Sequence, residues 1–314
     1  MKIIVTGGCG FMGSHFIEKI ASYYDVVNID KMTYAANSNT QKALLNFKNY
    51  KFICGDINDV DLMNEIIKKD DIVINFAAET HVDSSITDPN IFVQSNVIGV
   101  QNLLNVSRNR VKLFIQISTD EVYGSLKLQE NSSLETDILK PSSPYSASKA
   151  AAEMLCHAEY KTFGTPIIIT RSSNNYGPRQ NKEKLIPLFI TNLMQNKKVP
   201  LYGTGNNIRN WIHVKDNCNA IFTIMNFGKI GEIYNIGGDV ECSNISITEI
   251  LLKNFNKDHN FISYVQDRLG HDFRYSLNSE KTKKLGWKCD YNFEVGIEQT
   301  IDWYKNNEFF WRTL

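Results

Sequence analysis

The fold is decided by the stretch Thr6-Gly7-Gly8-Cys9-Gly10-Phe11-Met12-Gly13, which continues the apolar run Ile3–Thr6. Three of its four glycines, Gly7, Gly10 and Gly13, recur every third residue between a strand and a helix, which is typical of a dinucleotide-binding turn. Gly7 permits the tight turn, Gly10 lets backbone N–H groups approach a pyrophosphate, and Gly13 lets the helix pack close to the sheet. The pyrophosphate would lie at the positive end of the helix dipole.

Outward from this turn, short β-branched runs alternate with longer amphipathic stretches. The expected strands are Ile3–Thr6, Val26–Asp30, Lys51–Cys54, Ile72–Phe76, Lys112–Ser118 and Pro166–Thr170. The expected helices between them are Ser14–Tyr23, Asp59–Lys69, Asn90–Arg108 and Tyr145–Phe163. This alternation predicts right-handed βαβ units with strands buried on both faces. The fold class is therefore α/β, a Rossmann-type doubly wound parallel sheet.

The pattern loosens after about residue 170, where loops rich in Asn, Gly and Pro become frequent. The features expected there are loops at Ser172–Pro178 and Tyr202–Asn210, helices at Leu185–Asn196 and Phe293–Lys305, and a strand near residues 232–237 that returns to the sheet. We therefore expect residues 1–171 to form the dinucleotide-binding domain. Residues 172–314 are expected to form mainly a smaller C-terminal substrate-binding domain.

Composition and charge exclude several classes of partner. Lys plus Arg and Asp plus Glu both number 34, and no basic block stands out, which argues against nucleic-acid binding. No apolar run approaches membrane-spanning length and no leader precedes the first strand, so we expect no membrane partner and a cytoplasmic location. The six cysteines have neither C-x-x-C nor zinc-ligand spacing, which predicts buried, reduced thiols and no metal site.

An acidic residue indicates which dinucleotide would bind. Asp30 ends the second expected strand, about 20 residues after the glycine turn. Its carboxylate would accept hydrogen bonds from the adenosine ribose and repel a 2′-phosphate, which favours NAD over NADP. Lys31 follows and weakens this discrimination. Asp56-Ile57, past the third expected strand, either contacts the adenine edge or contains an aspartate that caps the next helix.

A tyrosine and a lysine form a candidate catalytic pair. Tyr145 and Lys149 stand at i and i+4 of a helix that Pro144 begins, so both would lie on one helix face. A tyrosine that accepts a proton near neutral pH needs its pKa lowered from about 10 to about 7, which costs about 4 kcal/mol. A nearby ammonium and a positively charged nicotinamide ring would favour the phenolate. The alternative is a surface Tyr and Lys on an amphipathic helix.

Two adjacent carboxylates follow the fifth expected strand, in Ser118-Thr119-Asp120-Glu121-Val122-Tyr123-Gly124. Ligands bind at the carboxyl ends of strands in open α/β sheets, so these side chains are well placed for chemistry. One carboxyl can act as an acid and its neighbour as a base where their surroundings separate the pKa values. The alternative is an Asp-Glu pair that caps the following turn.

With these motifs the chain resembles the extended short-chain dehydrogenase/reductase family, and within it the dTDP-glucose 4,6-dehydratases, over nearly its whole length. The segments that carry the resemblance are TGGCGFMGS from Thr6, NIDKMTYA from Asn28, AAETHVDSSI from Ala77, STDEVYG from Ser118, SPYSASKAAAE from Ser143, RSSNNYGP from Arg171, EKLIPL from Glu183, IRNWIHVKD from Ile208, YNIGG from Tyr234 and DRLGHDFRY from Asp267. Thr119-Asp120-Glu121 is the most diagnostic segment, because related epimerases and decarboxylases usually carry other residues there.

The resemblance implies an NAD-dependent hydro-lyase that acts on a nucleoside-diphosphate glucose, either dTDP-glucose or UDP-glucose. Tyr145 would take the proton of the sugar 4-hydroxyl while the C4 hydride passes to NAD⁺, with Thr119 and Lys149 assisting. The 4-ketone acidifies the C5 hydrogen, which Glu121 would remove while Asp120 protonates the departing 6-hydroxyl. The hydride would then return to C6 while Tyr145 or a neighbouring residue reprotonates C5, which gives an NDP-4-keto-6-deoxyglucose.

The resemblance also implies two sets of binding residues. The cofactor set, with the three glycines, is Gly7, Gly10, Phe11, Met12, Gly13, Asp30, Lys31, Thr33, Asp56, Ile57, Ala77, Ala78, Tyr145, Lys149 and Asn175. The substrate set is Thr80, Asn174, Lys184, Leu185, Arg209, Asn244, Arg268 and His271, with the two arginines as partners for the diphosphate. Family members are usually homodimers that pair the helices near Asn90–Arg108 and Tyr145–Phe163.

Three positions depart from the family pattern. Ser84 replaces a usual Arg, Leu269 replaces the usual Pro, and Arg179-Gln180-Asn181-Lys182 stands where aromatic residues or Pro are typical. The last two border the expected nucleotide pocket, so the choice between thymine and uracil stays open. Two other functions also stay open: a nucleotide-sugar 4-epimerase or decarboxylase that uses Tyr145 and Lys149, and a non-enzymatic NAD-sensing regulator.

Overall fold

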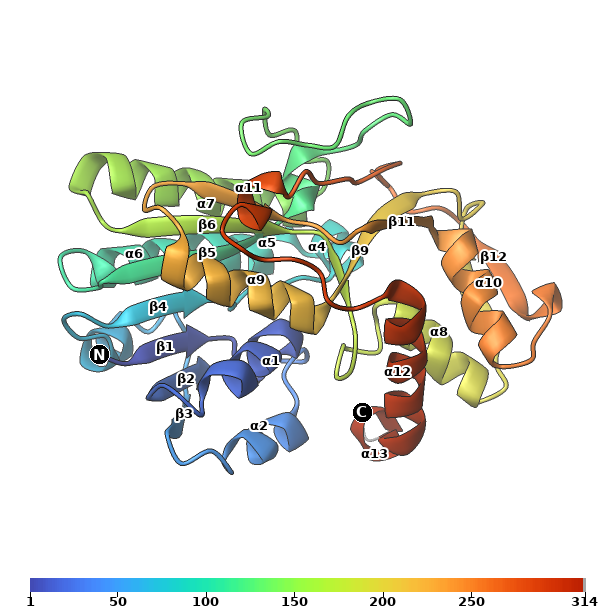
Figure 1. Cartoon of the computed structure of the whole chain (residues 1–314), viewed down its shortest axis with the longest axis horizontal. Helices are drawn as coiled ribbons and strands as arrows, with labels where there is room; N and C mark the ends of the chain where they lie inside the picture. The colour runs from blue at the N-terminus through green and yellow to red at the C-terminus, as the bar shows by residue number, and fades with distance from the viewer. Residues whose placement is uncertain (313–314) are drawn as a thin grey trace.

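The computed structural model describes residues 1–312, and its largest unit is a seven-stranded parallel sheet (Figure 1). The strands lie in the order β10-β6-β5-β4-β1-β2-β3. Their bounds are β1 Ile3–Thr6, β2 Val26–Asp30, β3 Tyr50–Cys54, β4 Ile72–Asn75, β5 Leu113–Thr119, β6 Ile167–Ser172 and β10 Ile233–Ile236. β1 pairs with β2 on one side and with β4 on the other, so the strand order reverses there. In open α/β sheets a ligand binds at the carboxyl ends of the strands beside such a reversal.

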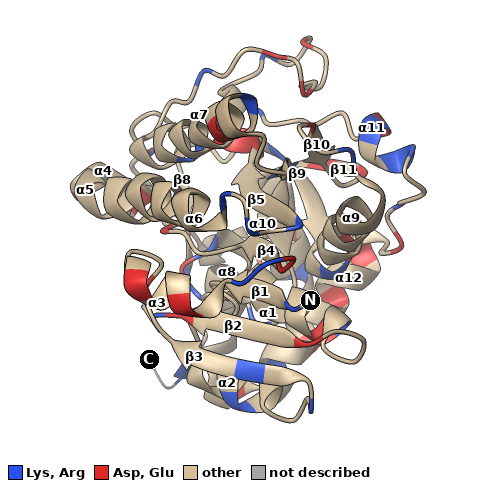
Figure 2. Ribbon diagram, turned by 90° about the vertical axis from the view of Figure 1, so that its left-hand side faces the viewer, with Lys and Arg blue, Asp and Glu red and all other residues tan. Residues whose placement is uncertain are grey.

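Helices cover both faces of this sheet (Figure 2). One face packs against α3 Val60–Ile66, α6 Gly99–Ser107 and α7 Pro144–Phe163, and the other against α1 Phe11–Ile20, α2 Ser38–Leu44 and α9 Val214–Phe227. The side chains of β1 show why two cores form. Ile3 and Val5 belong to the core on the α1 side and Ile4 to the core on the α7 side, because successive strand residues point to opposite faces.

The second half of the chain builds a further group of elements beside the sheet (Figure 1). Its strands form two small sheets, of β7 Asn174–Tyr176, β9 Ile208–His213 and β11 Val240–Ser243, and of β8 Val199–Tyr202 and β12 Ile262–Val265. Its helices are α8 Leu185–Met194, α10 Asn244–Asn254, α11 Glu280–Lys283, α12 Phe293–Asn306 and α13 Glu308–Arg312, with a 3₁₀ turn η3 at His259–Phe261. A third apolar core, which includes Phe189, Leu251 and Tyr304, joins α8, α10 and α12.

The structure confirms the parallel sheet and corrects several predicted elements. Asn90–Arg108 is not one α-helix but α5 Pro89–Phe92, a π-helix η1 Val93–Ile98 and then α6. α9 was not predicted, nor were the helix α4 Val82–Thr87 and the strands of the two small sheets. The predicted loop Tyr202–Asn210 already contains the first residues of β9. α1 begins at Phe11 rather than Ser14, because Gly10 is its N-cap.

Two other expectations concern membrane-spanning helices and the cysteines. No helix in residues 1–312 is both long and apolar enough to span a lipid bilayer. The cysteines are free thiols, and Cys9, Cys156 and Cys218 are buried as predicted. Cys54 is exposed, which contradicts the prediction of buried thiols, because it ends the edge strand β3.

Candidate active site

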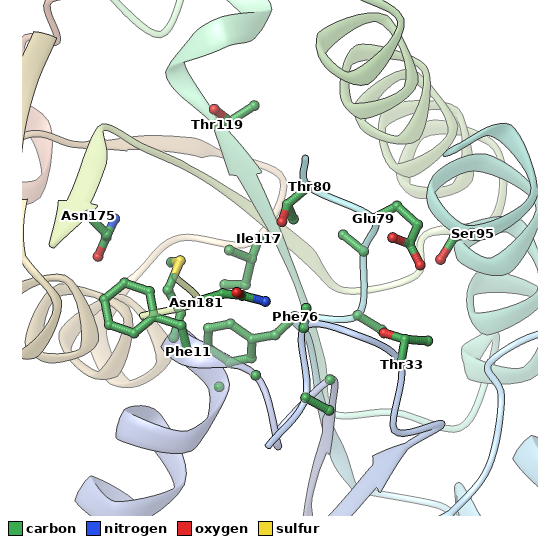
Figure 3. A pocket seen from close by; sticks show the side chains of 18 of the residues that line it. Phe11, Thr33, Phe76, Glu79, Thr80, Ser95, Ile117, Thr119, Asn175 and Asn181 are labelled. Carbon is green, nitrogen blue, oxygen red and sulfur yellow. The ribbon is translucent and has the colours of Figure 1, made fainter. Parts of the chain in front are cut away.

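A long pocket runs along the carboxyl ends of β1, β2, β4, β5 and β6 (Figure 3). At one end it is lined by the glycine turn and the residues after β2 and β3, and at the other by the residues that end β5 and begin α7. Phe76, which follows β4, and Ile117 on β5 lie between these ends in Figure 3. The pocket therefore joins the predicted cofactor residues to the predicted catalytic residues.

The glycine turn leaves space that a side chain would fill. Gly7 has φ +70°, and a Cβ there would come within 2.6 Å of the backbone N of Ala77. A Cβ on Gly13 would lie 2.6 Å from the carbonyl oxygen of Gly7. Helix α1 has no side-chain N-cap and no acidic residue in its first turn, so its first N–H groups can bind an anion. This geometry fits the pyrophosphate of a dinucleotide.

The same end of the pocket carries the acidic residue that was predicted to bind the ribose. Asp30 is buried, and its two carboxylate oxygens accept hydrogen bonds from the backbone N–H groups of Cys9, at 2.9 Å, and Met32, at 2.8 Å. A carboxylate has about four acceptor positions, so two remain for the ribose hydroxyls. Burial raises the pKa of Asp30, and the two backbone hydrogen bonds oppose that rise.

Lys31 and Asp56 form an ion pair of 3.2 Å beside Asp30. Burial is the largest influence on the pKa of Asp56, but hydrogen bonds from Asn58 and Lys31 outweigh it and lower the pKa. Because Asp56 neutralises Lys31, the lysine does not offer a free cation to a 2′-phosphate. The helix-cap interpretation of Asp56 is wrong, since Asp59 caps α3 by accepting from Leu62 N, whereas Asp56 lines the pocket.

The carboxylate pair lies in a 3₁₀ turn, η2 Asp120–Tyr123, at the end of β5. The Thr119 hydroxyl caps this turn by accepting from Glu121 N at 3.2 Å, and it donates to Asp120 Oδ1 at 3.2 Å. The proposed capping role of the Asp-Glu pair is therefore wrong, because Thr119 is the cap. The second oxygen of Asp120 is buried and has no hydrogen-bond partner among the described residues. It is free to contact a ligand in the pocket.

Helix α7 holds the tyrosine and the lysine in a fixed orientation. Pro144 occupies its first turn, and the Ser143 and Ser146 side chains form a reciprocal capping box. Tyr145 and Lys149 are only 8% and 5% exposed, so the interpretation as a surface pair is wrong. Lys149 Nζ donates to the carbonyl oxygen of Ile117 at 2.6 Å, which ties the helix to β5.

A buried ion pair fixes α7 and the η2 turn from behind. Arg171 donates to both carboxylate oxygens of Glu153 on α7, and its Nη1 donates to the Tyr123 hydroxyl at 2.6 Å. Ser118 donates to the same Glu153 carboxylate at 2.5 Å. Arg171 and Glu153 are 2% and 0% exposed, so this network lies in a low-dielectric interior and is rigid. It connects the end of β5 to the helix that carries Tyr145.

The surroundings of Asp120 and Glu121 favour different protonation states for the two carboxyl groups. Burial and the neighbouring charge of Glu121 raise the pKa of Asp120 to about 8, opposed by Arg209 and Thr119. Burial also raises the pKa of Glu121, but three cations, Lys184, Arg209 and Arg268, oppose the rise. The proton of the pair is therefore favoured on Asp120, as an acid requires, and the negative charge on Glu121, as a base requires.

The tyrosine does not have the lowered pKa that was expected from its lysine neighbour. Burial and the charge of Glu121 raise the pKa of Tyr145, and only the Thr119 hydroxyl lowers it. Burial lowers the pKa of Lys149 to about 8, and Glu153 opposes that fall. The ammonium points to the Ile117 carbonyl. Within the protein alone, Lys149 therefore does not favour the phenolate.

The pocket gathers most of the residues predicted from the sequence. All fifteen predicted cofactor residues line it, as do the predicted catalytic residues Thr119, Asp120 and Glu121. Of the substrate set, Thr80, Asn174 and Lys184 line it, and Lys184 Nζ donates to the Thr80 carbonyl at 2.8 Å. The residues of that set that do not line it are Leu185, Arg209, Asn244, Arg268 and His271.

The substrate-set arginines lie near Glu121 but have protein partners. Arg209 donates to the carbonyl oxygens of Ile208, at 2.8 Å, and Asp272, at 2.9 Å. Arg268 forms an ion pair of 2.6 Å with Asp83. In this structure both guanidinium groups are thus held by protein oxygens, and they act on Glu121 through charge alone.

Sequence reasoning missed several pocket residues. Those that end or directly follow strands, and that the strand-end rule could have found, are Gly55, Phe76, Ser172 and Ser173. Ile29, Ile117 and Ser118 lie just before the end of a strand. Those in loops or in η1, for which the local sequence gives no signal, are Ala35, Ala36, Glu79, Ser95 and Glu183. Gln180 and Asn181 also line the pocket, and they belong to the segment that was expected to border the nucleotide pocket. Buried oxygens of Asn174, Asn175, Gln180 and Glu183 have no hydrogen-bond partner among the described residues, so this wall offers acceptors to a ligand.

Comparison with known proteins agrees with this geometry. The family model described as GDP-mannose 4,6 dehydratase matches residues 4–300. The low-salt glycan biosynthesis protein Agl12 of Haloferax volcanii is 43% identical, with 98% of this chain and 100% of that protein covered. A dTDP-glucose 4,6-dehydratase of Streptomyces niveus is 42% identical, with 100% and 96% covered.

A solved structure is similar over the same length. The crystal structure of DesIV, a dTDP-glucose 4,6-dehydratase from Streptomyces venezuelae with NAD and TYD bound, is 40% identical with a TM-score of 0.96 and 99% of both chains covered. The sequence matches and this structural match extend over nearly the whole chain, so they include both the glycine turn and the carboxylate pair. This chain therefore belongs to the nucleotide-sugar dehydratase family described as GDP-mannose 4,6 dehydratase.

Proposed function

We propose that this protein dehydrates a nucleoside-diphosphate glucose to the NDP-4-keto-6-deoxyglucose. It is an NAD-dependent hydro-lyase, as are its dTDP-glucose 4,6-dehydratase relatives. The observation that carries the proposal is the single pocket that contains the glycine turn, the Tyr145–Lys149 helix and the Asp120–Glu121 pair. An epimerase or decarboxylase would use the turn and the helix but would have no use for the carboxylate pair.

Three features of the chain make the pocket suitable for NAD. The glycine turn accommodates the pyrophosphate, Asp30 can accept from the ribose, and the Lys31–Asp56 pair removes the free cation that a 2′-phosphate would need. When bound, NAD supplies an acceptor for the C4 hydride and a donor for C6. The fifteen residues of the predicted cofactor set are our candidates for its contacts.

We assign the first proton transfer to Tyr145. The Thr119 hydroxyl lowers the pKa of Tyr145. One helical turn away, the buried Lys149 donates a hydrogen bond to the Ile117 carbonyl. Since burial raises the pKa of Tyr145, the positive charge that favours its phenolate has to come from the ligands rather than from Lys149. Tyr145 then takes the proton of the sugar 4-hydroxyl, and Lys149 holds the helix in place.

We assign the loss of water to the carboxylate pair. Glu121, faced by three cations, removes the C5 proton that the 4-ketone has acidified. Asp120, whose pKa of about 8 keeps it protonated near neutral pH, gives its proton to the departing 6-hydroxyl. General acids and bases of this kind contribute typically about 10²–10⁴-fold each.

The substrate-binding role belongs mainly to residues 172–314 in this proposal. Asn174 and Lys184 line the pocket from that part of the chain, and Arg209 and Arg268 bring positive charge close to it. Arg268 would have to exchange Asp83 for the diphosphate. β10 and α9 are exceptions, because they belong to the central sheet and its covering layer.

We also propose a homodimer formed through α5, η1, α6 and α7. Ile91, Val93, Ile98 and Met154 on these helices are 50%, 47%, 43% and 52% exposed. Large apolar side chains on neighbouring helices favour a protein contact over solvent. Light scattering on the purified protein would show twice the chain mass, and a monomer at micromolar concentration would contradict the proposal.

Incubation with dTDP-glucose and UDP-glucose in separate reactions tests the function. We expect a keto sugar, detected by its absorbance in base and by the loss of one water in the mass spectrum. The faster of the two substrates identifies the preferred nucleotide. Recovery of both sugars at unchanged mass would contradict the dehydratase, and inverted configuration at C4 in the recovered sugar would favour an epimerase.

A further inference from the structure

The segment Pro178–Lys184, called the strap here, follows β7 and forms one wall of the dinucleotide pocket. Gln180, Asn181, Glu183 and Lys184 line the pocket from the strap. The opposite wall is the glycine turn with Phe11 and Met12 of α1, and Figure 3 shows Asn181, Phe11 and Phe76 among the side chains that line the pocket. A dinucleotide in this pocket therefore lies between α1 and the strap.

One side chain of the strap faces α1 instead of the pocket. Arg179 donates from Nη1 to Glu18 Oε1 at 2.7 Å and from Nη2 to Glu18 Oε2 at 2.6 Å. Its Nη2 also donates to His15 Nδ1 at 2.8 Å. His15 Nε2 donates in turn to the carbonyl oxygen of Pro178 at 2.9 Å. Arg179, His15 and Glu18 thus form a clasp between the strap and the helix that follows the glycine turn.

The properties of these three side chains suit a strong contact. Arg179 and His15 are 11% and 4% exposed, and a bidentate guanidinium–carboxylate pair is both directional and charge-assisted. Burial and the charge of Arg179 hold the pKa of His15 well below its usual range, so the ring is neutral and Nδ1 can accept. Arg179 has φ +68°, a left-handed conformation that a non-glycine residue keeps only where its surroundings hold it.

The strap has a second attachment on the same side of the pocket. Asn181 Nδ2 donates to the Tyr34 carbonyl in the loop after β2, at 3.2 Å. This contact is exposed and uncharged, so it is weaker than the clasp. Release of Arg179 would therefore remove the strongest of these contacts at the end of the strap that faces α1, while Lys184 Nζ still holds the other end through the Thr80 carbonyl at 2.8 Å.

We propose that the clasp of Arg179 with Glu18 and His15 closes the strap over bound NAD and sets how slowly NAD leaves the enzyme. The proposal rests on the proposed function, because it takes NAD as the occupant of the pocket. Arg179 is a positioning residue, since its side chain points away from the pocket. The enzyme regenerates its cofactor in each cycle, so slow release costs no turnover.

The test compares Arg179→Gln with the wild type. Both are purified and loaded with radiolabelled NAD, and loss of label is followed during dilution into unlabelled NAD, without substrate. We expect about tenfold or faster loss from Arg179→Gln, as removal of charge-assisted hydrogen bonds predicts. With saturating NAD in the assay, kcat and the KM for the sugar nucleotide should return to within about twofold of wild type, because Arg179 does not line the pocket.

Arg274→Gln is the matched control. Arg274 donates a similar fork to Glu241, at 2.7 and 3.0 Å, and is also 11% exposed, but it does not line the pocket. It should lose label at the wild-type rate. Glu18→Gln should also lose label faster than the wild type. The double variant Arg179→Gln/Glu18→Gln should lose label no faster than Arg179→Gln alone, because the two residues act as one contact.

Three results would overturn the proposal: wild-type retention in Arg179→Gln, equal loss in Arg274→Gln, or additive effects of the two clasp variants. Thermal melting of each variant in the presence of NAD separates a local effect from unfolding. A wild-type protein that cannot be loaded with NAD at all would instead overturn the proposed function. The failures of the two proposals are thus distinguishable.

Discussion

Asp120 is almost fully buried at the start of η2, and after burial the charge of Glu121 is the main influence on its pKa. Glu121 is the next residue, yet it faces Lys184, Arg209 and Arg268. Two identical functional groups in neighbouring positions thus receive different electrostatic surroundings. At the scale of single residues, this difference is what allows one site to run acid and base chemistry at the same pH.

Glu121→Gln tests the base. The amide cannot accept the C5 proton, whereas the oxidation of C4 by way of Tyr145 is untouched. In a stopped-flow experiment with substrate we expect the absorbance of reduced cofactor to rise and persist, and turnover to fall by about 10²-fold or more. Normal turnover by this variant would remove Glu121 from its proposed role.

Asp120→Asn tests the acid and its pH dependence. The folded-state pKa of about 8 lies above the ordinary value for Asp, so the acid form is present at neutral pH and is lost as the pH rises through about 8. In the wild type, the decay of reduced-cofactor absorbance should slow above that pH. In Asp120→Asn the decay should be slow at every pH while the initial rise is spared. Equal slowing of both phases would contradict the acid assignment.

At the scale of elements, the glycine turn and α1 act as one unit. Gly7 and Gly164 have nearly the same φ, +70° and +72°, but the space around them differs greatly. A Cβ on Gly7 would meet backbone atoms of Ala77 and Phe76 within 2.8 Å, whereas a Cβ on Gly164 would meet nothing within 4 Å. A comparison of substitutions at these two glycines therefore separates the free-energy cost of a positive φ from the free-energy cost of a steric clash.

We therefore predict different outcomes for Gly7→Ala and Gly164→Ala. Gly164→Ala should lose about 1–2 kcal/mol of unfolding free energy, the conformational cost alone, and keep its NAD. Gly7→Ala should lose about 1–3 kcal/mol more through the clash and should be purified with little NAD. Urea unfolding and the cofactor content of the purified proteins measure both effects. Equal NAD content in the two variants would show that close approach at Gly7 is not needed.

The elements also show what the sequence could predict. β1, β2 and α7 carry strong local signals, namely buried apolar runs and a proline-initiated helix, and they lie within a few residues of the predicted bounds. α9 was missed, because loop-like composition upstream hid the start of a helix whose apolar face packs on the sheet. The π-helix η1 was missed, because a one-residue change of hydrogen-bond register leaves no mark on hydrophobic periodicity.

At the scale of the whole molecule, the sheet brings together residues that are far apart in sequence. The strand-end rule places Asp30 and Thr119 at one edge, and both line the pocket. The clasp of Arg179 with α1 could not be predicted in this way, because it joins positions more than 160 residues apart through a loop. The electrostatic difference between Asp120 and Glu121 likewise depends on cations from the second half of the chain.

The most direct test of the account follows one hydrogen through the reaction. The substrate is an NDP-glucose that carries deuterium at C4, and the product is examined by NMR. Because the hydride taken from C4 is returned to C6 after water has left, we predict deuterium at C6 of the 4-keto-6-deoxy product. Deuterium lost to solvent, or found at C4 of an inverted sugar, would contradict the account.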